Sequence, residues 1–437
     1  MLITETELRR TQDLMDFISS CPTAYQAADK ISSILEDNKF TKLEKNDMTL
    51  ESVKMNNQAF FTWNDSAVFA YRRGSKGIKA GMRIYVAHDD SPSLQIKPCP
   101  MSRQNSYYLA ETLVYGGPIL NTHFDRVLAI AGRAFVLNKE TNEIEMKLVD
   151  LSDEYFYLPN VAIHFNRDVN SGHKIEAQTE LRLVYASAED DDKKEISFNS
   201  LIAKKLSCDE TAVLDYDLFT YNPGKGQFFG RDSEFFSISR IDDLAMVHAG
   251  LSAFVEKNDY DECFEGVSLL LIFSNEEIGS RTRQGAQSAI LSSFIDLLMS
   301  AENIDDADRL NIYAKSFALS ADQAHGLHPN YASYAANGTI PKLNYGPVLK
   351  YALTSYGTDA QAASYFKKLC LDADVPCQTF TNRSDLRGGS AIGPLLFPQV
   401  PIAVADIGNP QWSMHSFTES AGTKDQDLMI RVLSKFF

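Results

Sequence analysis

The segment 266-GVSLLLIFSNEEIGS-280 decides the expected fold, and its last residues point to a functional site. Residues 266–274 form a continuous apolar run, which predicts a strand buried on both faces of a sheet. The run ends at two adjacent carboxylates, Glu276 and Glu277. Two acids at a buried strand end repel each other and are costly without a cation, whereas a solvent-exposed pair is the ordinary alternative. After so apolar a run we favour the metal site, with one carboxylate as ligand and the other as general base.

Three more strand-like segments end beside residue types that commonly bind metals. They are MRIYVA (82–87), followed by His88 and Asp90; KSFALSAD (315–322), which ends at Asp322; and VPIAVADIGNP (400–410), followed by a loop that contains His415. Helical patterns such as GAQSAILSSFIDLLMSAE (285–302) alternate with these strands, which predicts an α/β fold. In open α/β sheets, ligands gather outside the carboxyl ends of the strands, so we expect the four ends to form one site.

The middle of the chain has a different hydrophobic pattern from the two ends. Residues 100–230 contain shorter strand patterns, among them RAFVLNK, IEMKLVD and LRLVYAS, separated by polar turns. These patterns predict a β-rich domain inserted between two parts of the α/β domain. We place the first α/β part at 1–98, the insert at 99–232 and the second α/β part at 233–437.

Composition narrows the classes of function. The chain has 437 residues, enough for two or three domains, and a net charge of −16 from 58 acidic and 42 basic residues. No basic stripe could neutralise phosphates and no glycine-rich phosphate loop follows a strand, so neither nucleic acid nor a nucleotide is an expected partner.

No stretch approaches the roughly 20 apolar residues that cross a bilayer, and the start does not resemble a signal peptide. The six cysteines form no C-x-x-C pair, so we expect reduced thiols in a cytoplasmic protein.

The candidate ligands match what a hydrolytic two-metal site requires. Such a site needs nitrogen and oxygen ligands, a bridging carboxylate, and a further carboxylate that takes a proton from water. His88 can bind metal while Asp90 accepts its other ring proton. Asp242 precedes an amphipathic helix, where an Asp usually caps the helix; because Asp243 can be the cap, Asp242 is free to bridge two metals. His415 is the remaining ligand.

The other histidines have less specific patterns. His325 and His328 have the spacing of an H-x-x-H metal pair, but the ligands are already supplied elsewhere, so we expect them beside the ligands or in a substrate pocket. His164 lies in an apolar segment, where a lone histidine is more often structural. The polar run at 166–170 that follows makes a functional role the alternative. His248 shares a helix face with apolar residues and is expected in the core or at an interface, not as a ligand.

Taken in order, these motifs resemble the aspartyl aminopeptidase family of co-catalytic zinc metallopeptidases. The resemblance runs through SCPTAYQAA (20–28), AHDDSPSLQIKP (87–98), FDRVLAIAGR (124–133), LPNVAIHFNRDVN (158–170), SRIDDL (239–244), FSNEEIGSRTRQGAQS (273–288), SADQAHGLHPNY (320–331), GPVLK (346–350), SAIGP (390–394) and DIGNPQWSMHS (406–416). Each motif alone is weak, but together they cover nearly the whole chain in register.

The resemblance implies a three-layer α/β/α peptidase domain that holds two zinc ions per subunit, with Co²⁺ or Mn²⁺ expected to substitute. His88 and Asp322 would bind one zinc, Glu277 and His415 the other, and Asp242 would bridge them. It further implies that Glu276 is the general base, which takes a proton from water and later delivers it to the leaving amine.

The resemblance also has implications for the insert and the pocket. His164 would stabilise the developing oxyanion or lie close to the metal, in its own or a neighbouring subunit's site. The insert would be a dimerisation domain, and dimers would build a dodecamer. His325 and His328 would line the pocket for a peptide with a free amino end.

Three departures from the family pattern bear on specificity. Asp89 replaces the usual Thr between His88 and its orienting Asp; the segment RSDLRGGSAIGP keeps Asp385 but differs in its middle; and Tyr345 stands where several relatives carry a basic residue, although Lys350 remains. A basic pocket residue is the simple basis for preferring acidic side chains. We expect removal of amino-terminal Asp or Glu, with another specificity or an inactive scaffold as alternatives.

Overall fold

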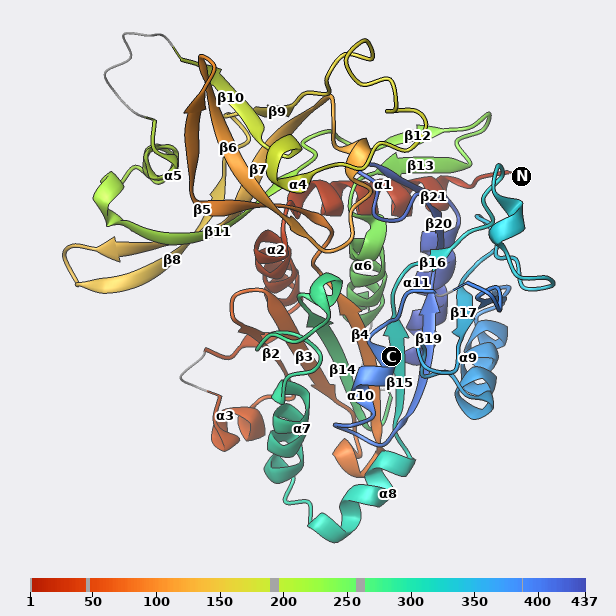
Figure 1. Ribbon diagram of the computed structural model, residues 1–437. Coiled ribbons are helices and arrows are strands. Elements are labelled where there is room, and N and C mark those ends of the chain that lie inside the picture. Colours follow the sequence, from red (N-terminus) through yellow and green to blue (C-terminus); the bar gives the residue numbers. More distant parts are fainter. Residues whose placement is uncertain (1, 45–47, 189–195, 257–263, 387) are drawn as a thin grey trace.

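A nine-stranded sheet forms the centre of the larger domain (Figure 1). The computed structural model describes residues 2–44, 48–188, 196–256, 264–386 and 388–437. Across the sheet the strands are β1 (Thr41–Lys42), β2 (Gln58–Trp63), β3 (Ala67–Arg73), β14 (Val267–Phe273), β4 (Met82–His88), β15 (Phe317–Ala321), β19 (Ala403–Gly408), β17 (Val348–Tyr351) and β18 (Gln378–Thr381). Four central neighbours, β14, β4, β15 and β19, run parallel. Their carboxyl ends therefore lie at one edge of the sheet.

The central strands are buried because helices cover both faces of the sheet. One face carries α1 (Glu5–Ser20), α2 (Ala24–Asp37), α6 (Ile241–Glu256), α9 (Ala360–Asp372) and α11 (Asp425–Phe436), and the other carries α3 (Leu50–Met55), α7 (Ile290–Ala301), α8 (Arg309–Ala314) and α10 (Gly393–Leu396). Every residue of β14 is buried, as its continuous apolar sequence predicts for a strand covered on both sides. This arrangement confirms the expected three-layer α/β/α fold.

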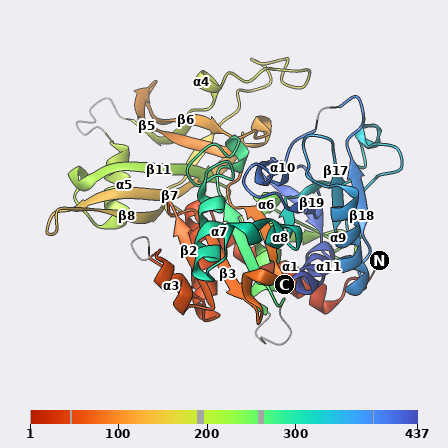
Figure 2. The same ribbon diagram turned by 90° about the horizontal axis from the view of Figure 1, so that it is seen from below.

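The inserted region folds as a closed barrel beside the sheet domain (Figure 2). Its strands are β5 (Ser93–Gln104), β6 (Tyr107–Tyr115), β7 (Arg126–Asn138), β8 (Glu143–Asp150), β9 (Phe156–Leu158), β10 (Leu183–Ser187) and β11 (Val213–Tyr221). Six of them close in the order β11-β5-β6-β10-β9-β7, and β8 pairs with β7 outside the ring. Helix α5 (Phe198–Leu206) adds apolar side chains to the barrel core, whereas α4 (Ala177–Glu180) is a single turn. The expected β-rich insertion is confirmed, and its limits at 99–232 stay a prediction.

Short connections hold the barrel at the carboxyl edge of the main sheet. Only residues 89–92 separate the end of β4 from the start of β5. A small third sheet brings distant segments to the same edge, and its strands are β12 (Gln227–Phe229), β13 (Phe235–Ile238), β21 (Glu419–Gly422), β20 (Pro410–Trp412) and β16 (Ala324–His325). Within the described ranges, no helix combines the length and apolar character needed to cross a membrane.

Candidate metal centre and active site

The four strand ends converge on one cluster of carboxylates and imidazoles. His88 is the last residue of β4, Glu276 and Glu277 follow β14 in a short 3-10 turn, and Asp322 comes directly after β15. His415 follows β20 in a loop and reaches the same cluster. The sequence placed these side chains on separate strand ends, and the parallel pairing brings those ends together.

Asp242 lies at the centre of the cluster. Its Oδ1 is 3.5 Å from Nε2 of His88, and its Oδ2 is 3.4 Å from Nε2 of His415. Ligand atoms of His88, Asp242 and Glu277 lie within 4.8 Å of one another, as do those of Asp242, Asp243 and Asp322. Asp242 belongs to both groups, which is the placement required of a carboxylate that bridges two cations.

The start of α6 gives Asp242 and its neighbour an irregular backbone. Both Asp242 and Asp243 have non-helical backbone angles, and the peptide bond between them is cis. The prediction that Asp243 caps the helix is wrong. In the described part of the chain, its Oδ2 accepts a hydrogen bond of 3.2 Å from the backbone N–H of His88, and none from the first turn of α6. Asp243 thus joins the start of α6 to the end of β4.

Both ring nitrogens of His415 have contacts that fix the orientation of the ring. Its Nε2 lies 3.3 Å from Oε1 of Glu277, and its Nδ1 lies 3.0 Å from the carbonyl oxygen of Gly117. That carbonyl can only accept, so Nδ1 carries a proton, and Nε2 is the ring nitrogen that faces the cluster. The carbonyl belongs to the insert, and the barrel therefore orients a candidate ligand of the other domain.

Lys350 is hydrogen-bonded to Asp322, another of the candidate ligands. Its Nζ donates to the carbonyl oxygen of Asp322 at 2.8 Å, lies 3.3 Å from Oδ2 of the same residue, and donates to the carbonyl oxygen of Gln323 at 3.3 Å. These three contacts use the three N–H groups of the ammonium. Because Lys350 is buried, we interpret it as a positioning residue for Asp322.

Asp90 orients His88 and also shapes the turn that carries the two glutamates. Nδ1 of His88 lies 3.0 Å from the carbonyl oxygen of Asp90 and 3.5 Å from its Oδ1. The carboxylate of Asp90 accepts hydrogen bonds from the backbone N–H groups of Glu276 and Glu277, at 3.0 and 3.2 Å. The hydroxyl of Tyr115, at the end of β6, donates to Oδ2 of Asp90 at 2.7 Å. Asp90 therefore links three parts of the site.

We expect Asp90→Asn to weaken zinc binding or turnover by about 10–100-fold, the usual effect of losing a residue that orients metal ligands. The amide would present N–H groups to backbone N–H groups that now donate to a carboxylate. Zinc affinity by competition with a chelator and kcat would be measured in parallel. Tyr115→Phe is the matched variant, because it removes one bond to Asp90 but keeps its charge. An Asp90→Asn enzyme with unchanged affinity and kcat would contradict the assigned role.

Sequence reasoning missed a second buried carboxylate that supports the cluster. Glu419, at the start of β21, accepts hydrogen bonds from the backbone N–H of Asp242 at 3.0 Å and of His415 at 2.7 Å. Ser91 donates to the carbonyl oxygen of Asp242 at 2.9 Å. Neither Glu419 nor Tyr115 lies in a recognisable local pattern, and only their long-range contacts reveal them.

The cluster holds more carboxylate than its own cations can neutralise. Burial raises the pKa of Glu276 to about 8 and of Glu277 to about 7, although His88 and His415 act in the opposite direction. Burial also raises the pKa of Asp243 well above its usual range. For His415, burial lowers the pKa, but hydrogen bonds to Asp242 and Glu277 outweigh it and raise the pKa to about 11.

These donors fit divalent zinc. Oδ1 of Asp242 and Oδ1 of Asp243 are buried and accept no hydrogen bond among the described residues. An orphaned carboxylate oxygen in such surroundings is costly unless a cation faces it. The donors are imidazole nitrogens and carboxylate oxygens without a thiolate, a set that zinc accepts in hydrolytic sites.

A cavity of about 590 Å³ lies next to the cluster. Its wall contains His325 and His328, as the sequence predicts, with many aromatic and apolar neighbours: Leu327, Tyr331, Tyr334, Ile340, Phe380, Trp412 and Met414. Lys350 does not line this cavity. Among the described lining residues, the charged side chain is Arg383, which Asp385 holds through two hydrogen bonds of 2.7 and 2.5 Å.

Two other histidines lie outside the cluster. His164 is exposed in the long connection between β9 and α4, the yellow loop that projects from the insert in Figure 1, and the cluster within this chain does not include it. His248 is buried on α6, where Nδ1 contacts Nε2 of Gln426 at 2.9 Å and the ring packs on Phe17. The predicted core role of His248 is confirmed.

Comparisons with known proteins identify the family. The family model for aminopeptidase I zinc metalloprotease (M18) matches residues 17–437. The chain is 40% identical over 437 residues to a probable M18 family aminopeptidase 2 of Clostridium acetobutylicum, covering 99% of both chains. It is 34% identical over 432 residues to the corresponding protein of Ectopseudomonas mendocina, covering 98% of this chain and 97% of that protein.

Solved structures agree with this result. A structure of Ape4 in complex with Nbr1 superposes with a TM-score of 0.94 at 30% identity, covering 100% of this chain and 87% of the other. The mApe1 dodecamer of Saccharomyces cerevisiae superposes with a TM-score of 0.85 at 25% identity, covering 99% and 97%. The chain belongs to the M18 family of zinc aminopeptidases and is thus a metallo-exopeptidase that hydrolyses peptides.

Proposed function

We propose that this aminopeptidase works with two zinc ions held by the cluster described above. His88 and Asp322 would hold one ion, Glu277 and His415 the other, and Asp242 would bridge them. The observation that carries the proposal is the position of Asp242, whose two oxygens face His88 and His415 from opposite sides. When bound, the ions would supply Lewis acidity that polarises the substrate carbonyl and lowers the pKa of a water.

Glu276 is the general base of the proposed mechanism. It is adjacent to Glu277 but belongs to neither group of ligand atoms that lie within 4.8 Å of one another. The hydrogen bond from its backbone N–H to Asp90 fixes its position at the turn. Its carboxylate would remove the proton of the attacking water and later deliver it to the nitrogen of the leaving amine.

The preference for acidic residues would depend on Arg383. This guanidinium lines the cavity beside the cluster, and its partner Asp385 is a largely exposed carboxylate. An exposed ion pair contributes about 0–1 kcal/mol, so a substrate carboxylate can compete for the same guanidinium. The aromatic walls support the second candidate, a two-metal aminopeptidase that prefers a neutral or aromatic first residue.

Initial rates on a panel of aminoacyl-4-nitroanilides would test both the function and its specificity. The enzyme is stripped of metal, and zinc, cobalt or manganese is then added back. We expect metal-dependent release of one residue, fastest for Asp or Glu, and a selective loss of roughly tenfold or more in kcat/KM for acidic substrates in Arg383→Gln. Arg309→Gln, at a surface ion pair, is the matched control. Faster cleavage of Leu or Phe would favour the second candidate, and no activity with any metal would refute the two-zinc proposal.

The proposed assembly is a dodecamer built from dimers through the insert. The S. cerevisiae relative is a dodecamer, and this supports the proposal for the present chain. The loop around His164 exposes Val161, Ile163 and Phe165, the last with 84% of its surface accessible. Because exposed apolar groups of this kind usually mark an interface, we propose that His164 serves the site of a neighbouring subunit.

A complementation experiment would test whether His164 acts between subunits. His164→Ala and Glu276→Gln are each expected to be nearly inactive. When the two variants are co-expressed, the active site of a His164→Ala subunit keeps its own Glu276. A neighbouring Glu276→Gln subunit can then supply the intact His164 to that site. Random pairing would then restore about a quarter of the sites. Activity that stays at the level of the separate variants would show that His164 acts in its own subunit or has no role.

We further propose that the protein works in the reducing cytoplasm. Cys21, Cys99, Cys208, Cys370 and Cys377 are free thiols, which supports this location, whereas Cys263 lies outside the described residues.

A further inference from the structure

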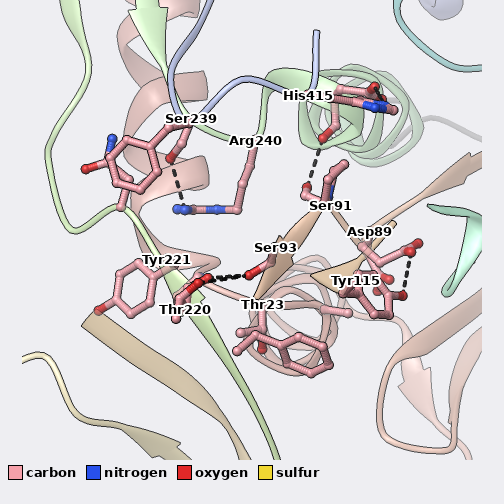
Figure 3. Close-up of a pocket in the computed structure, with 18 of the residues that line it drawn as sticks. Thr23, Asp89, Ser91, Ser93, Tyr115, Thr220, Tyr221, Ser239, Arg240 and His415 are labelled. Atoms are coloured by element: carbon pink, nitrogen blue, oxygen red, sulfur yellow. Dashed lines mark hydrogen bonds and ion pairs between the residues drawn. The ribbon is translucent and has the colours of Figure 1, made fainter. Parts of the chain in front are cut away.

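A second cavity, lined in part by Asp242, lies where the barrel meets the sheet domain (Figure 3). It encloses about 60 Å³ and is bordered by the start of α2, the loop after β4, the end of β11 and the segment that leads into α6. A water needs about 10–15 Å³ of such space. The cavity therefore has room for a few waters or one small ligand.

Arg240 is the arginine in the described wall of this cavity, and no lysine lines that wall. Its Nη1 donates to Oγ of Ser239 at 3.0 Å, and its Nη2 donates to the carbonyl oxygen of Ile18 at 3.1 Å. Its Nε is buried and has no hydrogen-bond partner among the described residues. The face of the Tyr221 ring lies 5.6 Å from the guanidinium carbon.

No carboxylate in the described part of the chain lies within ion-pair distance of Arg240. The carboxylate that acts on it electrostatically is Glu419, whose oxygens accept hydrogen bonds from the backbone N–H groups of Asp242 and His415. Arg240 is of intermediate exposure, but its Nε is buried, and neither a tyrosine face nor neutral acceptors cancel the charge of the guanidinium. The free N–H of Arg240 is therefore a donor that an anion could accept from.

A second donor adjoins the guanidinium. The hydroxyl of Ser239 accepts the bond from Arg240, and no described bond uses its own proton. Figure 3 shows the guanidinium lying between Ser239 on one side and Tyr221 and Thr220 on the other. Arg240 and Ser239 together thus offer charge and two hydrogen-bond donors to one small acceptor.

The acidic residues of the same wall serve other parts of the site. Asp90, Asp242 and Glu419 are engaged by the metal centre and the groups that orient it. Asp89 is buried, and its two oxygens have no hydrogen-bond partner among the described residues. It lies across the cavity from Tyr221 (Figure 3). The anionic acceptor would therefore occupy the Arg240 end.

We propose that this cavity binds one small monovalent anion, either a halide ion or a carboxylate group, on Arg240 and Ser239. The bound anion would join three elements: α1 through Ile18, the last barrel strand through Tyr221, and the segment that carries Asp242. It would thereby stabilise the junction of the two domains two residues before the candidate bridging ligand.

Crystals of the zinc-loaded wild-type enzyme soaked in sodium bromide would show the site directly. We expect an anomalous bromine peak beside Nε of Arg240 and Oγ of Ser239. Crystals grown in acetate without halide form the second arm, because a carboxylate there would appear as planar density on the same two groups. A peak in either arm supports the proposal and identifies the source of the anion. Ordinary water in both arms would overturn it, whether or not any variant folds.

Thermal unfolding of the same zinc-loaded enzyme gives a solution test. Chloride replaces a bulky sulfonate at constant ionic strength, and we expect a saturable rise in Tm on the order of 1–3 °C for the wild type. Arg240→Gln should lose this rise. Arg231→Gln, which removes an exposed arginine of the same region, should keep it. An equal rise in Arg240→Gln would place the anion elsewhere and contradict the proposal.

Discussion

Glu276→Gln is expected to lower kcat by about 10²–10⁴-fold while the enzyme keeps its zinc, since a positioned general base contributes that range. The amide has nearly the same shape as the carboxylate but cannot take a proton from water. The backbone N–H of residue 276 would still donate to Asp90, so the turn should keep its conformation. Metal content by mass spectrometry and steady-state rates on one aminoacyl-4-nitroanilide would be measured on the same preparation.

Glu265→Gln is the matched control for this change. Glu265 is an exposed residue on the surface, paired with Lys76, and its loss should leave kcat unchanged. A Glu276→Gln enzyme that kept more than about a tenth of the wild-type kcat would contradict its role as base. Glu277, its neighbour in the same turn, would then be the group to examine. Loss of zinc together with kcat would instead make Glu276 a ligand.

Asp242→Asn is expected to cause the second large loss, of both metal and activity. The substitution replaces the shared carboxylate between His88 and His415 by a neutral amide, so two cations would no longer be held together. Lewis-acid stabilisation is worth several kcal/mol, which corresponds to a fall of about 10³-fold or more in kcat/KM. Zinc content per chain should fall below that of the wild type, and chelation should strip it at lower chelator concentration.

Asp243→Asn separates the two adjacent aspartates. Oδ2 of Asp243 accepts a hydrogen bond from the backbone N–H of His88, whereas the aspartate in described contact with His415 is Asp242. We expect this variant to retain more zinc and more activity than Asp242→Asn. If Asp243→Asn lost its metal and Asp242→Asn kept it, the bridging role would belong to Asp243. Circular dichroism would confirm that both proteins are folded before either result is interpreted.

Much of the site was predictable because its main signals are local. A short, continuous apolar run such as that of β14 predicts a buried strand. Acidic residues directly after such a strand indicate a cation site, because buried carboxylates are costly without a cation. The same reasoning found His88, Asp322 and His415, because each follows an apolar strand pattern. Asp242 was harder, since an Asp before a helix is usually a cap, and only its neighbour Asp243 suggested otherwise.

Other roles could not be predicted from local pattern. Lys350 was expected either beside the metal ligands or in the substrate pocket, and local pattern could not choose between them; in the structure it is bonded to Asp322 and does not line the cavity. Arg383 lines it instead, and nothing in its local sequence distinguished it from an ordinary surface arginine. Whether a basic side chain faces a pocket or a neighbouring carboxylate depends on how two distant strands are packed.

The sequence by itself determined the fold class, the insertion and the residue types at the strand ends, because hydrophobic patterning acts over a few neighbouring residues. Tertiary structure alone decided which groups orient them. Glu419 reaches Asp242 across 177 positions of sequence, and Tyr115 reaches Asn275 across 160. Arg240 likewise reaches the carbonyl oxygen of Ile18 across 222 positions, while its Nε has no partner among the described residues. Such contacts arise only when separate elements pack, and the physical reason is that burial makes each polar group find a partner in space.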